Sequence, residues 1–408
     1  MLPGKRTAIW GYEGMFPGPT IKVLRGRRTT VRHINRLGIP TVVHLHGGPT
    51  PSESDGFPVD RVMPGTEKTY FYPNDRAATL WYHDHAIDHT GRNIFMGLAG
   101  LYIVESEHEQ NLPLPKDGYD VPLILQDRLF SADGALLYEP DSVDGPNTDT
   151  ILVNGAPWPK MEVSACRYRF RLLNASNARS FHLALSSGNP FVQIATDGGL
   201  FERPRPLQDI PLAMAERVEV IVDFSAYLVN TQITLDDLNQ PLATRSILRF
   251  DVVRKIKDDT YIPERLVETS ETVNDRSAPH RTFVFTRGNS VKTEARWSIN
   301  GEEFDPARAI TEVKLGDTEV WRLANHSFRE KHNVVHPIHI HLMNFQILQR
   351  NGGPPLPHEV GLKDTVALNV GDEVVVGMRV AGFRGRYLFH CHNLEHEDRG
   401  MMARFDVL

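Results

Sequence analysis

The sequence has little cysteine and no long apolar run. Its 408 residues contain two cysteines, Cys166 and Cys391, so at most one disulfide is possible. No apolar segment approaches the roughly 20 residues that a helix needs to cross a bilayer. The opening MLPGKRTAIW lacks the apolar core of a secretory signal. We therefore expect no membrane-spanning segment, and a protein that either stays inside the cell or has lost its export signal.

An excess of positive charge is also absent. The formal net charge is -6, which gives no reason to expect nucleic acid or an anionic membrane as a partner. Hydrophobic residues make up 40% of the chain and charged residues 24%, values that are typical of soluble globular proteins. A chain of this length is too long for one hydrophobic core, so two or three domains are expected.

Long amphipathic helices are scarce, and short runs of Val, Ile, Thr and Phe dominate instead. Gly, Pro, Asn and Asp separate these runs, which is the pattern of all-β sandwiches. A weak repeat relates residues 16–35 to the segments that start at Ala156 and Glu303. The spacing of about 140 to 150 residues is the size of one sandwich domain. We predict three copies of one β-domain, with boundaries in polar stretches, at residues 1–110, 111–265 and 266–408.

Histidine carries the chemical signal of this sequence. Eight of the 18 histidines form four pairs of the form His-x-His. In an extended strand, residues i and i+2 point to the same face, so each pair can direct two imidazoles into one space. The pairs are His44 and His46, His83 and His85, His339 and His341, and His390 and His392.

One such pair by itself is more often a solvent-facing or core pair than a metal site. Four pairs change that interpretation, because all of them fall in the predicted first and third domains, while His182 of the middle domain stands alone. A single zinc ion takes four protein ligands at most. Eight imidazoles are therefore better suited to a cluster of several metal ions.

A second constellation comprises His336, Cys391, His396 and Met401. Alternation along a strand turns Cys391 to the face opposite its two histidine neighbours. Two imidazoles, one thiolate and a weak axial thioether form the ligand set of blue copper sites, whereas zinc would be expected to bring more thiolates. Met402 is interpreted as a core residue, and Cys166 is left as a free structural thiol.

The motifs HLHGG, WYHDH, HPIHIH and HCHNLEHEDRGMM resemble, in order, the four copper-binding motifs of multicopper oxidases. The segments HLHGGPTPSESDG, GLAGLYIV and LEHEDRGMM are most similar to those of the branch that contains bacterial spore-coat laccases, bilirubin oxidases and phenoxazinone synthase. The likeness runs from about Gly11 to the C-terminus. It implies three consecutive cupredoxin-like Greek-key β-sandwich domains, of which the middle one is a spacer without copper ligands.

The resemblance also implies four copper ions, one of type 1, one of type 2 and a type 3 pair. The type 2 ion would be held by His44 and His339. The type 1 ion would be held by His336, Cys391, His396 and Met401. The type 3 pair would be held by His46, His83, His85, His341, His390 and His392.

The implied activity is that of a laccase. One-electron oxidation of phenols or aromatic amines, with bilirubin as a further donor, would be coupled to four-electron reduction of O2 to water. Cys391 is covalently continuous with His390 and His392, so the electron path is only a few residues long. His396 would lie at the donor-facing edge. We expect a monomer that is cytoplasmic, in a spore coat, or a mature exported form.

Two other functions stay open at this point. Some relatives are metallo-oxidases of Cu(I) or Mn(II), but cuprous oxidases often carry a methionine-rich insert, and the ten methionines here are scattered. The other alternative is a non-enzymatic copper-binding protein of the same fold. The complete set of ligand positions argues against it, since the loss of one histidine of a pair would suffice to abolish the cluster.

Asp55 and Glu397 match acidic residues that the family uses near its copper cluster. A buried carboxylate at such a place can transfer protons to the oxygen. The alternative is a solvated surface acid, which is the usual state of Asp and Glu.

We predict that Glu397→Gln slows oxygen reduction while the copper content is retained, because the amide cannot take up and release a proton. Oxygen consumption and metal analysis of the same sample test this. Turnover equal to that of the unchanged protein would remove Glu397 from the mechanism.

Overall fold

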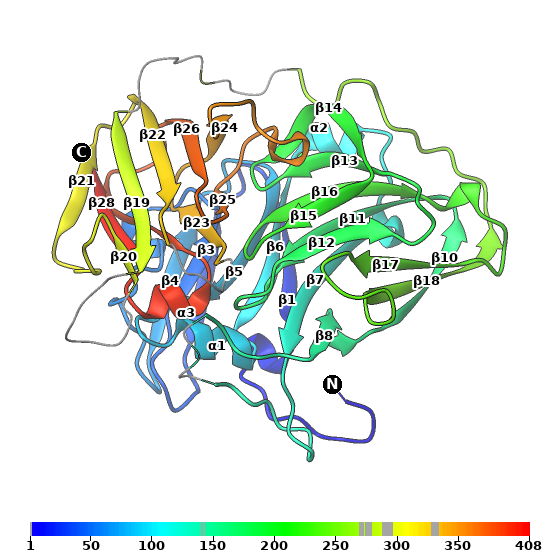
Figure 1. The fold of residues 1–408 in the computed structure, drawn as a ribbon, viewed down its shortest axis with the longest axis horizontal. Coiled ribbons are helices and arrows are strands. Elements are labelled where there is room, and N and C mark those ends of the chain that lie inside the picture. Colours follow the sequence, from blue (N-terminus) through cyan, green and yellow to red (C-terminus); the bar gives the residue numbers. More distant parts are fainter. Residues whose placement is uncertain are drawn as a thin grey trace.

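The computed structural model describes residues 2–139, 142, 144–268, 273, 280–287, 297–327 and 334–408. Strands dominate these residues, and the α-helices are short: α1 (Thr90–Met96), α2 (Glu107–Asn111) and α3 (Leu394–Asp398). No helix among the described residues is long and apolar enough to span a membrane. The strands form sheets along three successive stretches of the chain, coloured blue to cyan, turquoise to green, and yellow-green to red in Figure 1. The predicted all-β class is confirmed.

The first stretch forms a four-stranded sheet in the order β1-β6-β5-β3 and a two-stranded sheet of β2 and β4. Tyrosines and aliphatic residues, among them Tyr70, Tyr102 and Leu80, pack in its core. The strands are β1 (Gly18–Leu24), β2 (Thr29–Ile34), β3 (Val43–His46), β4 (Glu67–Tyr72), β5 (Ala78–Asp84) and β6 (Ala99–Glu105), with short 3-10 turns η1 (Tyr12–Gly14) and η2 (Ser52–Ser54).

The second stretch forms a five-stranded sheet, β10-β18-β17-β12-β15, and a seven-stranded sheet, β14-β13-β16-β11-β7-β8-β9. Its own core includes Phe170, Phe224 and Phe250. The elements are η3 (Asp117–Tyr119), β7 (Asp120–Arg128), β8 (Thr150–Val153), β9 (Ala156–Pro157), β10 (Lys160–Ala165), β11 (Arg167–Asn174), β12 (Phe181–Leu185), β13 (Phe191–Thr196), β14 (Gly199–Leu207), β15 (Asp209–Leu212), β16 (Arg217–Asp223), η4 (Phe224–Ala226), β17 (Gln232–Asp237) and β18 (Ser246–Lys255).

The third stretch forms two five-stranded sheets, β20-β19-β22-β26-β24 and β21-β28-β27-β23-β25. Trp321, Phe389 and Cys391 belong to its core. The elements are β19 (Arg281–Arg287), β20 (Trp297–Ile299), β21 (Ala309–Val313), β22 (Thr318–Asn325), β23 (His336–Ile340), β24 (Phe345–Arg350), η5 (Pro357–Glu359), β25 (Thr365–Leu368), β26 (Glu373–Arg379), β27 (Gly385–Cys391) and β28 (Met402–Val407).

The weak sequence repeat reappears as a repeated pairing of strands. The strands β1, β10 and β21, which begin the three repeats, each pair in parallel with the last strand of their own stretch, namely β6, β18 and β28. The strands that follow, β2, β11 and β22, each pair antiparallel with β4, β16 and β26. Three copies of one β-sandwich are therefore confirmed. The boundaries at 110/111 and 265/266 stay a prediction, and residues 269–272 and 274–279 near the second one lie outside the described residues.

A buried cluster of charges joins the first stretch to the second. Arg171 donates to the Thr79 hydroxyl over 2.9 Å and to Glu219 over 3.0 Å. Glu219 also accepts from Arg169 over 2.8 Å and from the Thr79 hydroxyl over 2.6 Å. Burial opposes the ionisation of Glu219, but the guanidinium groups of Arg169 and Arg171 overcome it and lower the pKa of this carboxyl to about 2. The carboxylate is therefore charged, paired and out of contact with water.

We predict that Glu219→Gln lowers the free energy of unfolding by about 3 kcal/mol, because Arg169 and Arg171 lose one of the two buried carboxylates to which both donate hydrogen bonds, and only Glu109 remains in that role. Denaturant unfolding at neutral pH measures this. The matched control is Glu67→Gln, which breaks the exposed ion pair with Arg32 and should change stability little. Equal effects of the two substitutions would contradict the prediction.

Candidate metal centre

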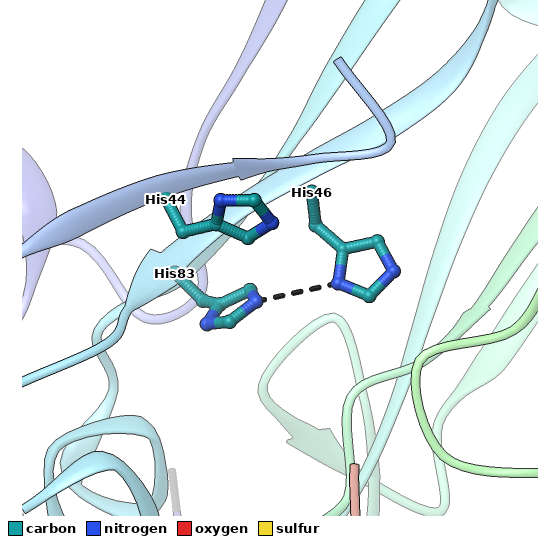
Figure 2. Close-up of side chains that lie close together, drawn as sticks. All are labelled: His44, His46 and His83. Atoms are coloured by element: carbon teal, nitrogen blue, oxygen red, sulfur yellow. Dashed lines mark hydrogen bonds between the residues drawn. The ribbon is translucent and has the colours of Figure 1, made fainter. Parts of the chain in front are cut away.

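The four His-x-His pairs meet between the first and third stretches of the chain. β3 carries the first pair, and β5 with the residue after it carries the second. β23 and β27, each with the residue that follows, carry the other two. His44 lies opposite His83 in the register of β3 and β5, and His339 lies opposite His390 in that of β23 and β27. Figure 2 shows three of these rings, on β3 and β5, turned toward one another. All eight side chains are buried.

The shortest contacts between ring nitrogens, of 3.2 to 3.4 Å, divide the eight imidazoles into three groups. The first group is a pair, in which the Nε2 atoms of His44 and His339 are 3.4 Å apart. The second is a trio around His83. Its Nε2 atom is 3.4 Å from Nδ1 of His46 (Figure 2) and 3.4 Å from Nε2 of His392.

The third group is a trio around His390. Its Nε2 atom is 3.3 Å from Nε2 of His85 and 3.2 Å from Nε2 of His341. Each of the three groups contains rings from both the first and the third stretch, so neither stretch completes a group alone. The resemblance implied the pair of His44 and His339 and a set of six other histidines, and the structure adds the division of those six into two trios.

The protonation of these rings fits metal binding. Burial lowers the pKa of His85 to about 4. Burial is also the main reason why the pKa values of His44, His83 and His392 fall well below the usual value. These four rings are therefore neutral near pH 7, which is the form that binds a metal ion. In a trio the central nitrogen faces two others, and one N–H proton can satisfy only one such contact. A metal ion held by the three rings would satisfy all three nitrogens.

The nitrogens on the far side of the rings are held by backbone oxygens. Nδ1 of His44 is 2.5 Å from the carbonyl oxygen of Asp55, and Nδ1 of His339 is 2.9 Å from that of Asp364. Nδ1 of His83 is 2.8 Å from the carbonyl oxygen of Asp84. An N–H donated to these acceptors fixes the tautomer and leaves Nε2 free for a metal ion.

Both predicted acids lie at the site. An Oδ2 atom of Asp55 is 2.8 Å from Nδ1 of His341. Glu397 reaches two rings, with carboxylate oxygens 3.1 Å from Nδ1 of His390 and 3.4 Å from Nδ1 of His85. Both carboxyl groups are buried, so neither is the solvated surface acid of the alternative interpretation. Their part in proton transfer stays a prediction.

The second constellation also comes together. The Sγ atom of Cys391 is 3.3 Å from Nδ1 of His336 and 3.5 Å from Nδ1 of His396, and the two nitrogens are 3.2 Å apart. Ser327 lies 2.8 Å from Nε2 of His336 and so holds that ring from behind. The three side chains are completely buried. Their donor set fits one copper ion with a thiolate ligand.

The surroundings of this thiolate site differ in part from the expectation. His396, expected at a donor-facing edge, is buried with its ring centroid 3.9 Å from that of Trp297, a residue that the sequence did not single out. Met401 is buried, and its backbone carbonyl accepts from the Cys391 N–H over 3.0 Å. Met402 packs with Phe57 and Leu388, as expected of a core methionine.

Two functional candidates escaped the sequence analysis. Asp364 lies 3.1 Å from Nε2 of His46, and Arg217 of the middle stretch donates to Asp364 over 2.7 Å. Neither residue belongs to a histidine motif, and no local spacing marks them. The predicted free thiol Cys166 is confirmed as buried and unpaired, and burial raises its pKa to about 11.

Known proteins resemble this chain over nearly its whole length. Two family models described as multicopper oxidase match residues 1–109 and 276–408. The chain is 36% identical to a laccase of Bacillus subtilis, covering 98% of this chain and 90% of the laccase. It is 40% identical to a bilirubin oxidase of Albifimbria verrucaria, covering 97% and 72%.

Solved structures show the same similarity. The crystal structure of a laccase from Pediococcus acidilactici superposes with a TM-score of 0.91 at 34% identity, covering 100% of this chain and 87% of that one. Sequence, fold and the arrangement of the histidines agree, and the chain belongs to the multicopper oxidase family.

Proposed function

We propose that this chain is a laccase-like oxidase that couples one-electron oxidation of phenols or aromatic amines, with bilirubin as a further donor, to four-electron reduction of O2 to water. One observation carries the proposal. Eight buried imidazoles form groups of two, three and three, and β27 links them directly to a separate His-Cys-His site. The laccase and bilirubin oxidase relatives support the class of donor.

The residues present fit four copper ions, as the family implies. When bound, copper would supply the transfer of single electrons from the donor and of four electrons to O2. The pair would hold the type 2 ion, and each trio would hold one ion of the type 3 pair. The type 1 ion would be held by His336, Cys391, His396 and Met401.

The chain itself contributes orientation and a dry environment. Strand alternation at the end of β27 places Cys391 on one face and His390 on the other, so the two sites are one peptide bond apart. Asp55, Asp84 and Asp364 fix the rings through their carbonyl oxygens. Trp297 covers His396. Small aromatic donors and a monomeric state complete the proposal.

We predict that the copper-loaded protein is blue, because a thiolate bound to copper gives a charge-transfer band in the visible range. Cys391→Ser should lose the band and reduce oxygen uptake to background, while copper at the histidine cluster remains. Visible absorption and metal analysis of both proteins test this. A colourless wild-type sample with its full copper content would contradict the assignment of Cys391.

Oxygen consumption separates laccase activity from metal oxidation. We expect uptake with a phenol and with a bilirubin-like tetrapyrrole, measured beside a cuprous salt and with the Cys391→Ser variant as the control. Uptake with the cuprous salt alone would favour a metallo-oxidase. No uptake with any of the three donors by copper-loaded protein would overturn the proposed function.

A further inference from the structure

Asp364 contacts two histidines of the cluster with different atoms. Its carboxylate lies 3.1 Å from Nε2 of His46, and its carbonyl oxygen lies 2.9 Å from Nδ1 of His339. His46 therefore turns Nδ1, and His339 turns Nε2, toward the neighbouring rings. The next residue, Thr365, brings its hydroxyl within 3.2 Å of the same His46 nitrogen. One short segment thus orients a ring of the pair and a ring of a trio.

This segment is held by the middle stretch, which contributes none of the twelve predicted ligands. Arg217, at the start of β16, donates through both terminal nitrogens to the two carboxylate oxygens of Asp364, one of them over 2.7 Å. Such a bidentate pair fixes the plane of the carboxylate as well as its position. Asp197 accepts from the backbone N–H groups of Asp364 and Thr365 over 3.3 and 3.4 Å.

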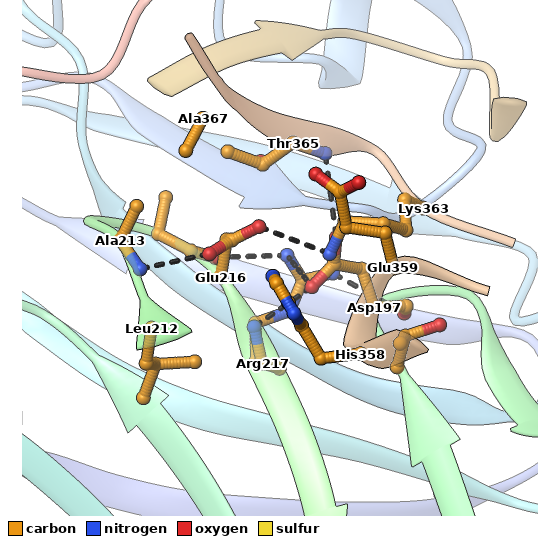
Figure 3. A network of polar contacts seen from close by, with 12 residues as sticks. Asp197, Leu212, Ala213, Glu216, Arg217, His358, Glu359, Lys363, Thr365 and Ala367 are labelled. Carbon is orange, nitrogen blue, oxygen red and sulfur yellow. Dashed lines mark hydrogen bonds and ion pairs between the residues drawn. The ribbon is translucent and has the colours of Figure 1, made fainter. Parts of the chain in front are cut away.

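A second ion cluster anchors the residue before Asp364. The Lys363 ammonium lies 3.0 Å from Asp197 and 3.1 Å from Glu216, and all three side chains are buried. Figure 3 shows this network, with Glu216, the residue before β16, and Arg217, the first residue of β16, close to Lys363 and Asp197. Lys363, Asp364 and Thr365 are therefore each bound to the middle stretch, and the carbonyl oxygen of Asp364 between them contacts His339.

Arg217 reaches the first stretch as well. Its Nε atom donates to the carbonyl oxygen of Thr79 over 3.0 Å, and Thr79 lies on β5, which also carries His83. One side chain therefore contacts all three stretches of the chain. These contacts lie next to the place where histidine rings of the first and third stretches meet.

The sequence leaves room for this contact beside His46. Gly47 has a positive φ of 83°, and a Cβ atom there would come within 2.5 Å of Asp364 Oδ2 and 2.6 Å of Arg217 Nη2. Any larger residue would displace the ion pair. The backbone after the ligand His46 thus packs directly against Asp364 and Arg217.

We propose that Arg217 is a positioning residue for the histidine cluster, acting through Asp364 to set the rings of His46 and His339. The inference rests on the proposed function, since it gives these rings a metal to bind. It goes beyond that function by giving the middle domain a direct part in the site, in place of the spacer role expected from the sequence.

The test uses the full chain with Arg217→Lys, Arg217→Met and Asp364→Asn. Lysine keeps the charge but loses the two-pronged geometry, and asparagine keeps the shape of Asp364 but loses its charge. Substitution of residues that hydrogen-bond to metal ligands typically weakens metal binding about 10- to 100-fold. In a titration with a chelator, all three variants should therefore release copper from the histidine cluster at about 10- to 100-fold lower chelator concentrations than the wild-type protein. The signal of type 2 copper in electron paramagnetic resonance should change with it.

The matched control is Arg171→Met. Arg171 is equally buried at the junction of the first and second stretches, but its hydrogen bonds and ion pairs reach none of the eight histidines of the cluster; its partners are Thr79, Glu105, Glu109, Asp120 and Glu219. This variant should lose stability while keeping the copper affinity of the cluster. The visible band of the thiolate site should persist in all four variants, which gives an internal measure of correct folding.

The outcomes are distinct. Lowered cluster affinity in the Arg217 and Asp364 variants, with the visible band intact, supports the proposal. Wild-type affinity in Arg217→Lys and Asp364→Asn overturns it and leaves Arg217 a purely structural residue. If the wild-type protein binds copper but consumes no oxygen with any donor, the proposed function fails, and the affinity comparison still decides the role of Arg217.

Discussion

The structure depends on the contact between two strand pairs that come from opposite ends of the chain. β3 and β5 bring four imidazoles from the first stretch, and β23 and β27 bring four from the third. Each group of ring nitrogens combines members from both sides, so a shift of either strand pair breaks all three groups at once. Buried imidazole nitrogens without partners are costly, and this cost makes the relative placement of the two sandwiches the central constraint.

The middle stretch meets this constraint with buried charge instead of apolar contact alone. Arg171 and Glu219 lie at its junction with the first stretch, and Arg217 pairs with Asp364 at its junction with the third. Buried ion pairs add little net stability, but separating the partners is strongly unfavourable. Such pairs penalise every docking geometry except the one in which all charges meet. A domain without ligands can in this way determine where the ligands of its neighbours lie.

Hydrogen-bond acceptors on the outer side of the cluster hold the rings in a single orientation. Backbone carbonyls of Asp55, Asp84 and Asp364 accept from the outer nitrogens of three rings. His46 is the exception, because its Nε2 atom faces a carboxylate and its Nδ1 atom faces the cluster. The carboxylate that holds it is itself fixed by Arg217. The orientation of His46 therefore depends on two residues in succession, Asp364 and Arg217.

Much of the fold and the site could be predicted from residues alone. Short β-branched runs with turn residues between them indicated β-sandwiches, and a weak repeat indicated three copies. Both signals depend on residues that are close together in the sequence, since strand propensity and period-two alternation are local properties. Alternation likewise separated Cys391 from its neighbours His390 and His392. The motif likeness then supplied the pairing of His44 with His339, which the ring distances match.

By itself, then, the sequence determined the strand class, the strand face on which each candidate ligand lies and which side chains are predicted to bind metal. Only the tertiary structure decided how the other six rings divide into two trios, how deeply His396 is buried under Trp297, and that Arg217 and Asp364 lie at the site. The contacts of Asp364 with Arg217 and His46 join residues that are 147 and 318 positions apart. No local period records such contacts, since they arise from the docking of whole sandwiches and from the cost of leaving buried charges unpaired.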